Sequence, residues 1–126
     1  MDQKKKILVV EDDKALRTVL VDRLAIDGFE VSEASDGEEG LAKALSEHPD
    51  LIMLDIVMPK MDGIEVLEKL RADEWGKEAS VMMLTNLSDN TQIKKAASRG
   101  VEDYLVKAEW DIEGIVSHVK AKLSLL

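Results

Sequence analysis

The sequence contains no cysteine, and it has no apolar stretch long enough to span a bilayer. The first absence excludes a disulfide framework and a thiolate metal site, and it is compatible with a reducing compartment. The second argues against a transmembrane helix. The basic start "MDQKKK" is followed by "ILVV", which is shorter than the core of a signal peptide. We therefore expect a cytoplasmic chain that does not associate with membranes.

Basic residues are also fewer than acidic ones. The chain has 26 acidic and 17 basic residues, which gives a formal net charge of −9. An excess of this sign opposes direct binding to nucleic acid or to an anionic membrane. The sequence therefore predicts proteins and cations as partners.

No low-complexity segment, Ser/Pro-rich linker or internal repeat interrupts the chain. A length of 126 residues fits one domain with a single hydrophobic core. We therefore expect residues 1–126 to form a single domain.

One alternation runs through the whole chain: short apolar runs alternate with segments of helical periodicity. Three of the runs are apolar at every position, as expected for strands that are buried on both faces. The segments between them repeat apolar residues every three or four positions, which is typical of amphipathic helices. The runs are "ILVV" (7–10), "FEVSEA" (29–34), "LIML" (51–54), "VMML" (81–84) and "YLV" (104–106). The pattern predicts an α/β fold in which a doubly wound, five-stranded parallel sheet is covered by five helices.

Reactive side chains directly follow four of the five predicted strands. In an open parallel sheet, ligands bind beyond the carboxyl ends of the strands, so these side chains should meet at one edge. Asp13 is expected to cap the following helix rather than to join the site. The residues are Glu11, Asp12 and Asp13 after the first run, Asp55 after the third, Thr85 after the fourth and Lys107 after the fifth.

The predicted cluster is strongly acidic, because one ammonium group cannot balance several carboxylates. A hard divalent cation would neutralise it, and Mg²⁺ suits a site built from carboxylate oxygens and water. A carboxylate beside such an ion, a hydroxyl and an ammonium could attack phosphorus, because phosphoryl transfer depends mainly on positioning and charge neutralisation.

Four segments resemble the response-regulator receiver domains of two-component signalling, the CheY-like family with a flavodoxin-like fold. They are "ILVVEDD", "LIMLDIVMPKMDG", "VMMLT" and "DYLVK", in the family's order and spacing. By this resemblance, Asp55 would accept the phosphoryl group, and the chain would be a single receiver domain without an output domain. Glu11, Asp12 and Asp55 would hold Mg²⁺ together with the backbone carbonyl of Val57.

The resemblance also implies a switch and its partners. Thr85 and Lys107 would contact the phosphoryl group, and Thr85 would move together with the switch aromatic Tyr104. The donor would be a sensor histidine kinase or a histidine phosphotransfer protein. The face formed by the fourth helix, fifth strand and fifth helix would then bind a downstream protein or a second copy of the chain. Such a protein catalyses its own phosphorylation and dephosphorylation but is not a conventional enzyme.

Two residues depart from the family pattern. Ala108 follows Lys107 where the family usually has a proline with a cis bond, which puts the reach of Lys107 in question. Asn86 follows Thr85 where the family usually has a small residue, so access to the site could differ.

Two other functions remain open at this point. An aspartate-nucleophile phosphohydrolase would typically need a second carboxylate two residues after Asp55, where this chain has Val57. A non-phosphorylated interaction module could keep the fold, but the complete set of reactive residues argues against it. An EF-hand, a phosphate-binding GxxxxGK[ST] loop and a GxGxxG motif are absent from the sequence.

Overall fold

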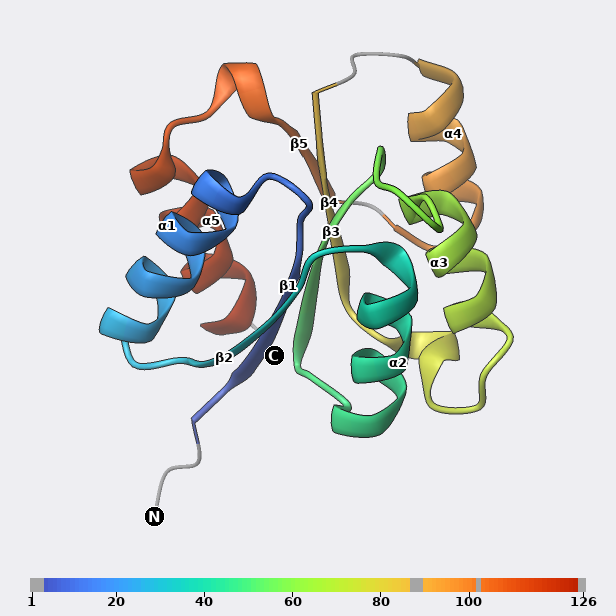
Figure 1. The fold of residues 1–126 in the computed structure, drawn as a ribbon, viewed down its shortest axis with the longest axis horizontal. Helices are drawn as coiled ribbons and strands as arrows, with labels where there is room; N and C mark the ends of the chain where they lie inside the picture. Colours follow the sequence, from blue (N-terminus) through green and yellow to red (C-terminus); the bar gives the residue numbers. More distant parts are fainter. Residues whose placement is uncertain (1–3, 87–89, 102, 125–126) are drawn as a thin grey trace.

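A computed structural model describes residues 4–86, 90–101 and 103–124. It shows a five-stranded, all-parallel sheet with the strand order β2-β1-β3-β4-β5 (Figure 1). The predicted fold class is thereby confirmed. The strands are β1 Lys6–Val10, β2 Glu30–Ala34, β3 Leu51–Asp55, β4 Val81–Thr85 and β5 Asp103–Val106. The helices are α1 Lys14–Ile26, α2 Gly37–Glu47, α3 Gly63–Arg71, α4 Asn90–Ser98 and α5 Ile112–Ser124, with short 3₁₀ helices η1 Gly76–Glu78 and η2 Lys107–Glu109.

Two helical layers sandwich the sheet, and each has its own apolar core (Figure 1). Helices α1 and α5 cover one face, whereas α2, α3 and α4 cover the other. Successive residues of a strand point to opposite faces, so Ile7 and Val9 pack in the α1/α5 layer while Leu8 and Val10 pack in the other. Complete burial of an aliphatic side chain of this size stabilises the fold by about 1.5–3 kcal/mol. This alternation explains why the inner residues of β1, β3 and β4 are apolar at successive positions.

The helix ends follow the expected capping chemistry. The Asp13 side chain accepts hydrogen bonds from the backbone amides of Ala15 (3.0 Å) and Leu16 (3.2 Å), which confirms its predicted role as an N-cap. Asp36 accepts from the amide of Glu39 (2.9 Å), while the Glu39 carboxylate reaches back to the amide of Ser35 (2.8 Å).

Glycines terminate two helices as expected. Gly28 follows α1 with φ +99°, and Gly100 follows α4 with φ +81°, both in the left-handed region. Ser88 precedes α4 and belongs to a residue type that commonly caps helices, but it lies outside the described residues. In the described part of the chain, none of the helices combines the length and the apolar character that crossing a bilayer requires.

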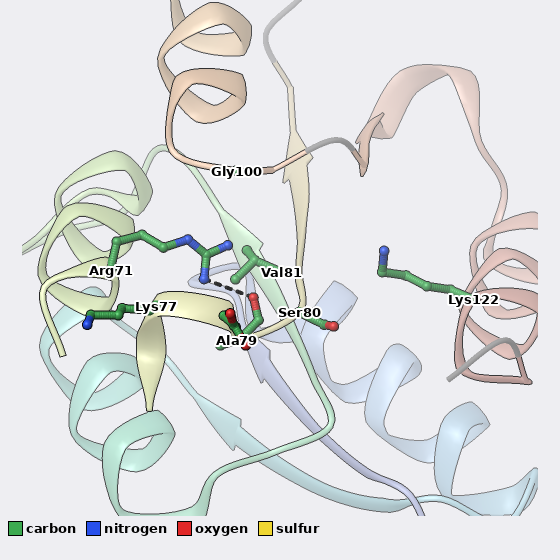
Figure 2. A pocket seen from close by; sticks show the side chains of 8 residues that line it. Arg71, Lys77, Ala79, Ser80, Val81, Gly100 and Lys122 are labelled. Atoms are coloured by element: carbon green, nitrogen blue, oxygen red, sulfur yellow. Dashed lines mark hydrogen bonds between the residues drawn. The ribbon is translucent and has the colours of Figure 1, made fainter. Parts of the chain in front are cut away.

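The amino end of β4 is held by a partly buried arginine. Arg71, the last residue of α3, donates to the carbonyl oxygens of Gly76 (2.7 Å), Ala79 (2.9 Å) and Arg99 (2.7 Å). Arg71 lines a pocket of about 220 Å³, and its guanidinium group points toward Ala79 (Figure 2). Arg71 therefore joins α3, η1 and the segment after α4 at the opposite end of the sheet from the predicted site.

Candidate functional site

Three carboxylates meet beyond the carboxyl ends of β1 and β3. Glu11 and Asp12 directly follow β1, and Asp55 is the last residue of β3. Each offers one oxygen, and these three oxygens lie within 4.8 Å of one another. Glu11 and Asp55 are buried, with 0% and 4% of their surface exposed, whereas Asp12 is exposed. The structure thus brings together the three acids that the strand-end rule predicted.

Lys107 supplies the positive charge of the cluster. It directly follows β5, and its Nζ lies 2.5 Å from Glu11 Oε1 and 3.2 Å from Asp55 Oδ2. Its side chain is only 12% exposed, so water screens these ion pairs weakly. The peptide bond between Lys107 and Ala108 is trans. Lys107 therefore reaches the acids although alanine stands where the family has proline.

The Glu11 carboxylate is anchored at both oxygens. Oε2 accepts a hydrogen bond from the Asp13 amide at 3.0 Å. Oε1 forms an ion pair with the Lys107 ammonium, and this buried oxygen has no hydrogen-bond partner among the described residues. An oxygen of this kind beside two further carboxylates is a suitable ligand for a hard cation. The residues present therefore fit a Mg²⁺ site.

The pKa values of the cluster depend on burial and on neighbouring charge. Burial, followed by the negative charge of Glu11, raises the pKa of Asp55 to about 7, although Lys107 acts in the opposite direction. Burial by itself would lower the pKa of Lys107. The close contact with the Glu11 carboxylate and the charges of Asp55 and Glu11 together outweigh burial and raise it. Lys107 is therefore a fixed cation, while Asp55 changes its charge near neutral pH.

The other predicted residues occupy different parts of the same region. Thr85 ends β4 and is 1% exposed. It pairs with Val106 in the sheet register, so it lies next to the strand that leads into Lys107. Val57 follows Asp55 by two residues and is 59% exposed. Tyr104 pairs with Met83, farther back along the sheet, and its side chain is 38% exposed.

The sequence analysis missed two residues that shape the site. Arg17 of α1 donates from Nη1 to the backbone carbonyl of Glu11 at 2.7 Å. Gly63 begins α3, and its amide donates to the carbonyl of Ile56 at 2.7 Å. A Cβ atom at Gly63 would lie 2.2 Å from the carbonyl oxygen of Asp55. Gly63 ends the segment "LIMLDIVMPKMDG" and follows the helix-capping Asp62, but neither signal singled it out, and Arg17 has no evident local signal.

The parallel fold and the cluster of acids and lysine define a class, the CheY-like receiver domains. The family model described as the response regulator receiver domain matches residues 7–120, and the chain belongs to this family. Two solved structures support the assignment. Chemotaxis response regulator CheY4 of Vibrio cholerae has a TM-score of 0.86 and 29% identity, covering 94% of this chain and 98% of that one. A CheY-like receiver domain protein from Methanospirillum hungatei has a TM-score of 0.88 and 30% identity, covering 97% and 95%.

Curated relatives include several regulators of transcription. A probable transcriptional regulator, ycf27, of Porphyridium aerugineum is 43% identical over 105 residues, which are 83% of this chain and 42% of that protein. The DNA-binding dual master transcriptional regulator RpaA of Synechocystis is 38% identical over 118 residues, covering 94% and 48%. The alkaline phosphatase synthesis regulator PhoP of Bacillus subtilis is 43% identical over 103 residues, covering 82% and 42%. The chain thus spans less than half the length of these relatives.

Proposed function

We propose that the chain receives a phosphoryl group on Asp55 from a histidine kinase or a histidine phosphotransfer protein. The observation that carries the proposal is the position of Asp55. It is a buried carboxylate at a strand end, within 4.8 Å of two further acids and 3.2 Å from a lysine ammonium. A buried carboxylate needs compensating positive charge, and at the end of a strand it would be able to attack an incoming phosphorus atom.

Glu11, Asp12 and Asp55 would hold Mg²⁺, together with the backbone carbonyl of Val57. When bound, Mg²⁺ would supply positive charge against the phosphoryl oxygens, which favours the transition state of phosphoryl transfer. The Asp13 amide and Lys107 keep the Glu11 carboxylate in place. The Glu11 carboxylate is therefore held in one orientation before a metal binds.

The chain's own residues would carry the transfer as follows. An ionised Asp55 oxygen attacks phosphorus, and an O–P bond forms as the P–N bond to the donor histidine breaks. The electron pair of that bond stays on the imidazole nitrogen, which takes up a proton. Lys107 pairs with a phosphoryl oxygen, and the Thr85 hydroxyl donates a hydrogen bond to another. These groups give the chain a part in catalysing its own phosphorylation and dephosphorylation.

The output would be a change of surface. A phosphoryl group adds a charge of about −1.5 to −2, which would draw Thr85 inward and bring Tyr104 after it. The face of α4, β5 and α5 would then bind a downstream protein or a second copy of the chain. Because several relatives are named as transcriptional regulators, we propose that the signal serves transcription. The net charge of −9 disfavours direct contact between this chain and nucleic acid.

The deciding experiment is intact-mass measurement after incubation with a small phosphodonor and Mg²⁺. The parent protein should gain one hydroxylamine-labile phosphoryl group, and Asp55→Asn should gain none while keeping the parent's circular dichroism spectrum. Asp13→Asn is the matched control, because asparagine also caps helices and Asp13 is outside the acid cluster. Full labelling of Asp55→Asn would place the acceptor elsewhere, and an unlabelled parent would favour the non-phosphorylated interaction module.

A further inference from the structure

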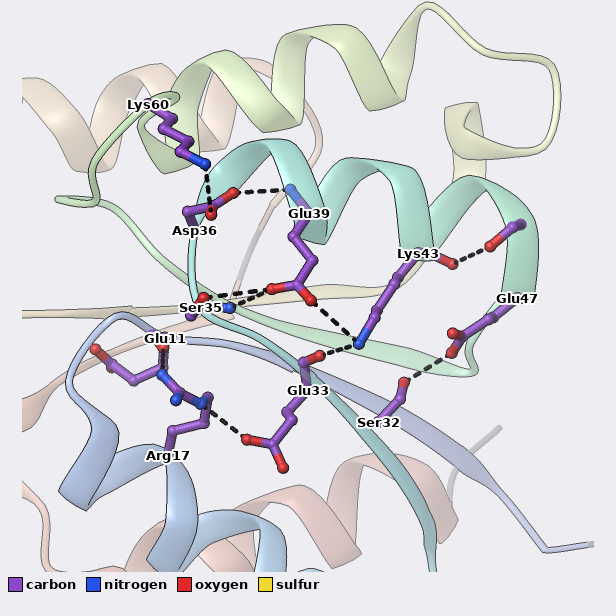
Figure 3. Close-up of polar contacts among 11 residues, drawn as sticks. Glu11, Arg17, Ser32, Glu33, Ser35, Asp36, Glu39, Lys43, Glu47 and Lys60 are labelled. Atoms are coloured by element: carbon purple, nitrogen blue, oxygen red, sulfur yellow. Dashed lines mark hydrogen bonds and ion pairs between the residues drawn. The ribbon is translucent and has the colours of Figure 1, made fainter.

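Arg17 joins the turn after β1 to strand β2. Its Nη1 donates to the carbonyl oxygen of Glu11 at 2.7 Å, and its Nε donates to Glu33 Oε1 at 2.9 Å (Figure 3). The side chain is only 13% exposed, although it arises from the otherwise solvent-facing start of α1. Both contacts come from one planar guanidinium group, so each fixes the direction of the other.

The carbonyl that Arg17 contacts belongs to Glu11, the first residue of the acid cluster along the chain. Strand β1 ends at Val10, so the Glu11 carbonyl lies beyond the regular strand. The Glu11 amide donates to the Ala34 carbonyl at 3.0 Å, and this bond holds the other side of the residue. The orientation of the peptide between Glu11 and Asp12 thus depends directly on Arg17. That peptide sets the direction in which the Asp12 side chain leaves the backbone.

Glu33 is itself held in a wider network of polar side chains (Figure 3). Lys43 of α2 contacts the Glu33 carbonyl and pairs with the Glu39 carboxylate at 3.5 Å. Glu39 in turn accepts from the Ser35 amide. The backbone of Glu33, from which the carboxylate partner of Arg17 extends, is therefore held by β2 and by Lys43 of α2 rather than by a loop.

We propose that Arg17 is a positioning residue for the metal site, acting through the Glu11 carbonyl to fix the turn that carries Glu11 and Asp12. The inference rests on the proposed function, because it assumes that these acids bind Mg²⁺. At the acid cluster, Arg17 contacts the neutral backbone carbonyl of Glu11 and not the carboxylates that would bind the metal, so its role there is geometric. Residues that orient metal ligands typically contribute about 10- to 100-fold to metal affinity.

Replacing Arg17 distinguishes a positioning role from an electrostatic one, because the two roles predict opposite changes in Mg²⁺ affinity. The loss of a nearby positive charge would strengthen the binding of a cation by Coulomb attraction alone. The loss of a fixed turn would weaken it, because the acids must then be ordered when the metal binds. Weaker binding in an uncharged variant therefore indicates positioning.

The experiment measures Mg²⁺ affinity by calorimetry in the parent and in Arg17→Met and Arg17→Lys. We expect about 10-fold weaker binding for Arg17→Met, and a smaller loss for Arg17→Lys, which keeps the charge but not the two-pronged geometry. Arg23→Met is the matched control. Arg23 lies on the same helix and pairs with Glu113 of α5, away from the acids, so its replacement should leave Mg²⁺ affinity unchanged.

A second measurement uses the metal-free protein. Amide exchange at Asp12 and Asp13 should be faster in Arg17→Met than in the parent, whereas amides of the β1 strand should be unchanged. Equal or tighter Mg²⁺ binding by Arg17→Met would overturn the positioning role while leaving the metal site intact. A parent that binds no Mg²⁺ would overturn the metal site and the inference with it, even if the amide exchange differed.

Discussion

At the scale of single residues, the charge of Asp55 links the stability of the protein to pH. An aspartate in an unfolded chain has a pKa of about 3.9, whereas burial and Glu11 raise the pKa of Asp55 to about 7 in the fold. Between these values the folded protein holds a proton that the unfolded chain has lost. The stability contributed by this group is therefore complete below about pH 4 and lost as the pH rises through about 7.

We predict that Mg²⁺ and protons compete at Asp55. Mg²⁺ at millimolar concentration should raise the melting temperature more at about pH 8 than at about pH 6, because Asp55 is ionised only at the higher pH. Thermal unfolding followed by circular dichroism, with and without Mg²⁺, tests this. Asp55→Asn should reduce the Mg²⁺ effect and remove most of its dependence on pH. Equal shifts of the parent at both pH values would contradict the prediction.

The sequence located the reactive residues of the site better than the residues that support them. Glu11, Asp55 and Lys107 were predicted because each directly follows an apolar run, and parallel strands bring their carboxyl ends together. Arg17 could not be predicted, because its partners lie in the turn after β1 and on β2, and only the tertiary fold brings them into reach. The elevated pKa of Asp55 likewise depends on burial, which a linear pattern does not quantify.

At the scale of elements, the close approach of α3 to the end of β3 depends on the absence of a side chain. A Cβ atom at Gly63 would lie 2.2 Å from the Asp55 carbonyl oxygen and 2.9 Å from the Ile56 Cα. These are backbone atoms, so they cannot move without shifting the strand end itself. The first residue of α3 thereby sets the distance between this helix and the backbone of Asp55.

We predict that Gly63→Ala lowers the free energy of unfolding by about 1–3 kcal/mol, the usual cost of forcing an extra group into a packed interior. Urea unfolding measures the change. Gly114→Ala in α5 is the control, because its Cβ would contact mainly the Asp111 carboxylate oxygen and the Trp110 ring, which are side chains able to yield. A Gly63→Ala protein as stable as the parent would show that α3 can move away from β3.

Element types were predicted more accurately than element ends. The run "FEVSEA" suggested a strand from residue 29, but β2 begins at Glu30 because the Phe29 amide still bonds to the Leu24 carbonyl at the end of α1. The end of α4 is a second example. This helix ends at Ser98, and the next residue, Arg99, pairs through its guanidinium group with Glu68 of α3. Local competition between helix ends and strand starts decides such positions, and periodicity does not resolve it.

At the scale of the whole molecule, much of the charge on the α4-β5-α5 face is already paired within one copy. Asp103 pairs with His118 (2.8 Å) and Lys122 (3.4 Å), and Glu113 pairs with Arg23 of α1. Glu102 of this face lies outside the described residues. A two-fold dimer that paired these charges between copies would have to break the ion pairs within each copy, so it would not add new ones. Exposed ion pairs contribute little on average, so the exchange would neither cost nor gain much.

We therefore predict that self-association of the phosphorylated protein, through this face, is weak and sensitive to salt. Sedimentation velocity over a range of concentrations should show a rising coefficient at low ionic strength and a monomer at high ionic strength. A tight dimer that persists at high salt would contradict the prediction and indicate an apolar interface. A monomer under both conditions would leave a different protein as the partner of this face.

The pleat of β4 separates two neighbouring methionines by the full thickness of the sheet. Met82 packs in the layer of α1 and α5, and Met83 packs in the layer of α2, α3 and α4, both fully buried. Their methyl groups are therefore two spectroscopic probes, one residue apart in sequence, each sensing a different side of the molecule. Isotope labelling of methionine methyls would resolve whether a signal arriving at Asp55 spreads into one helical layer or into both.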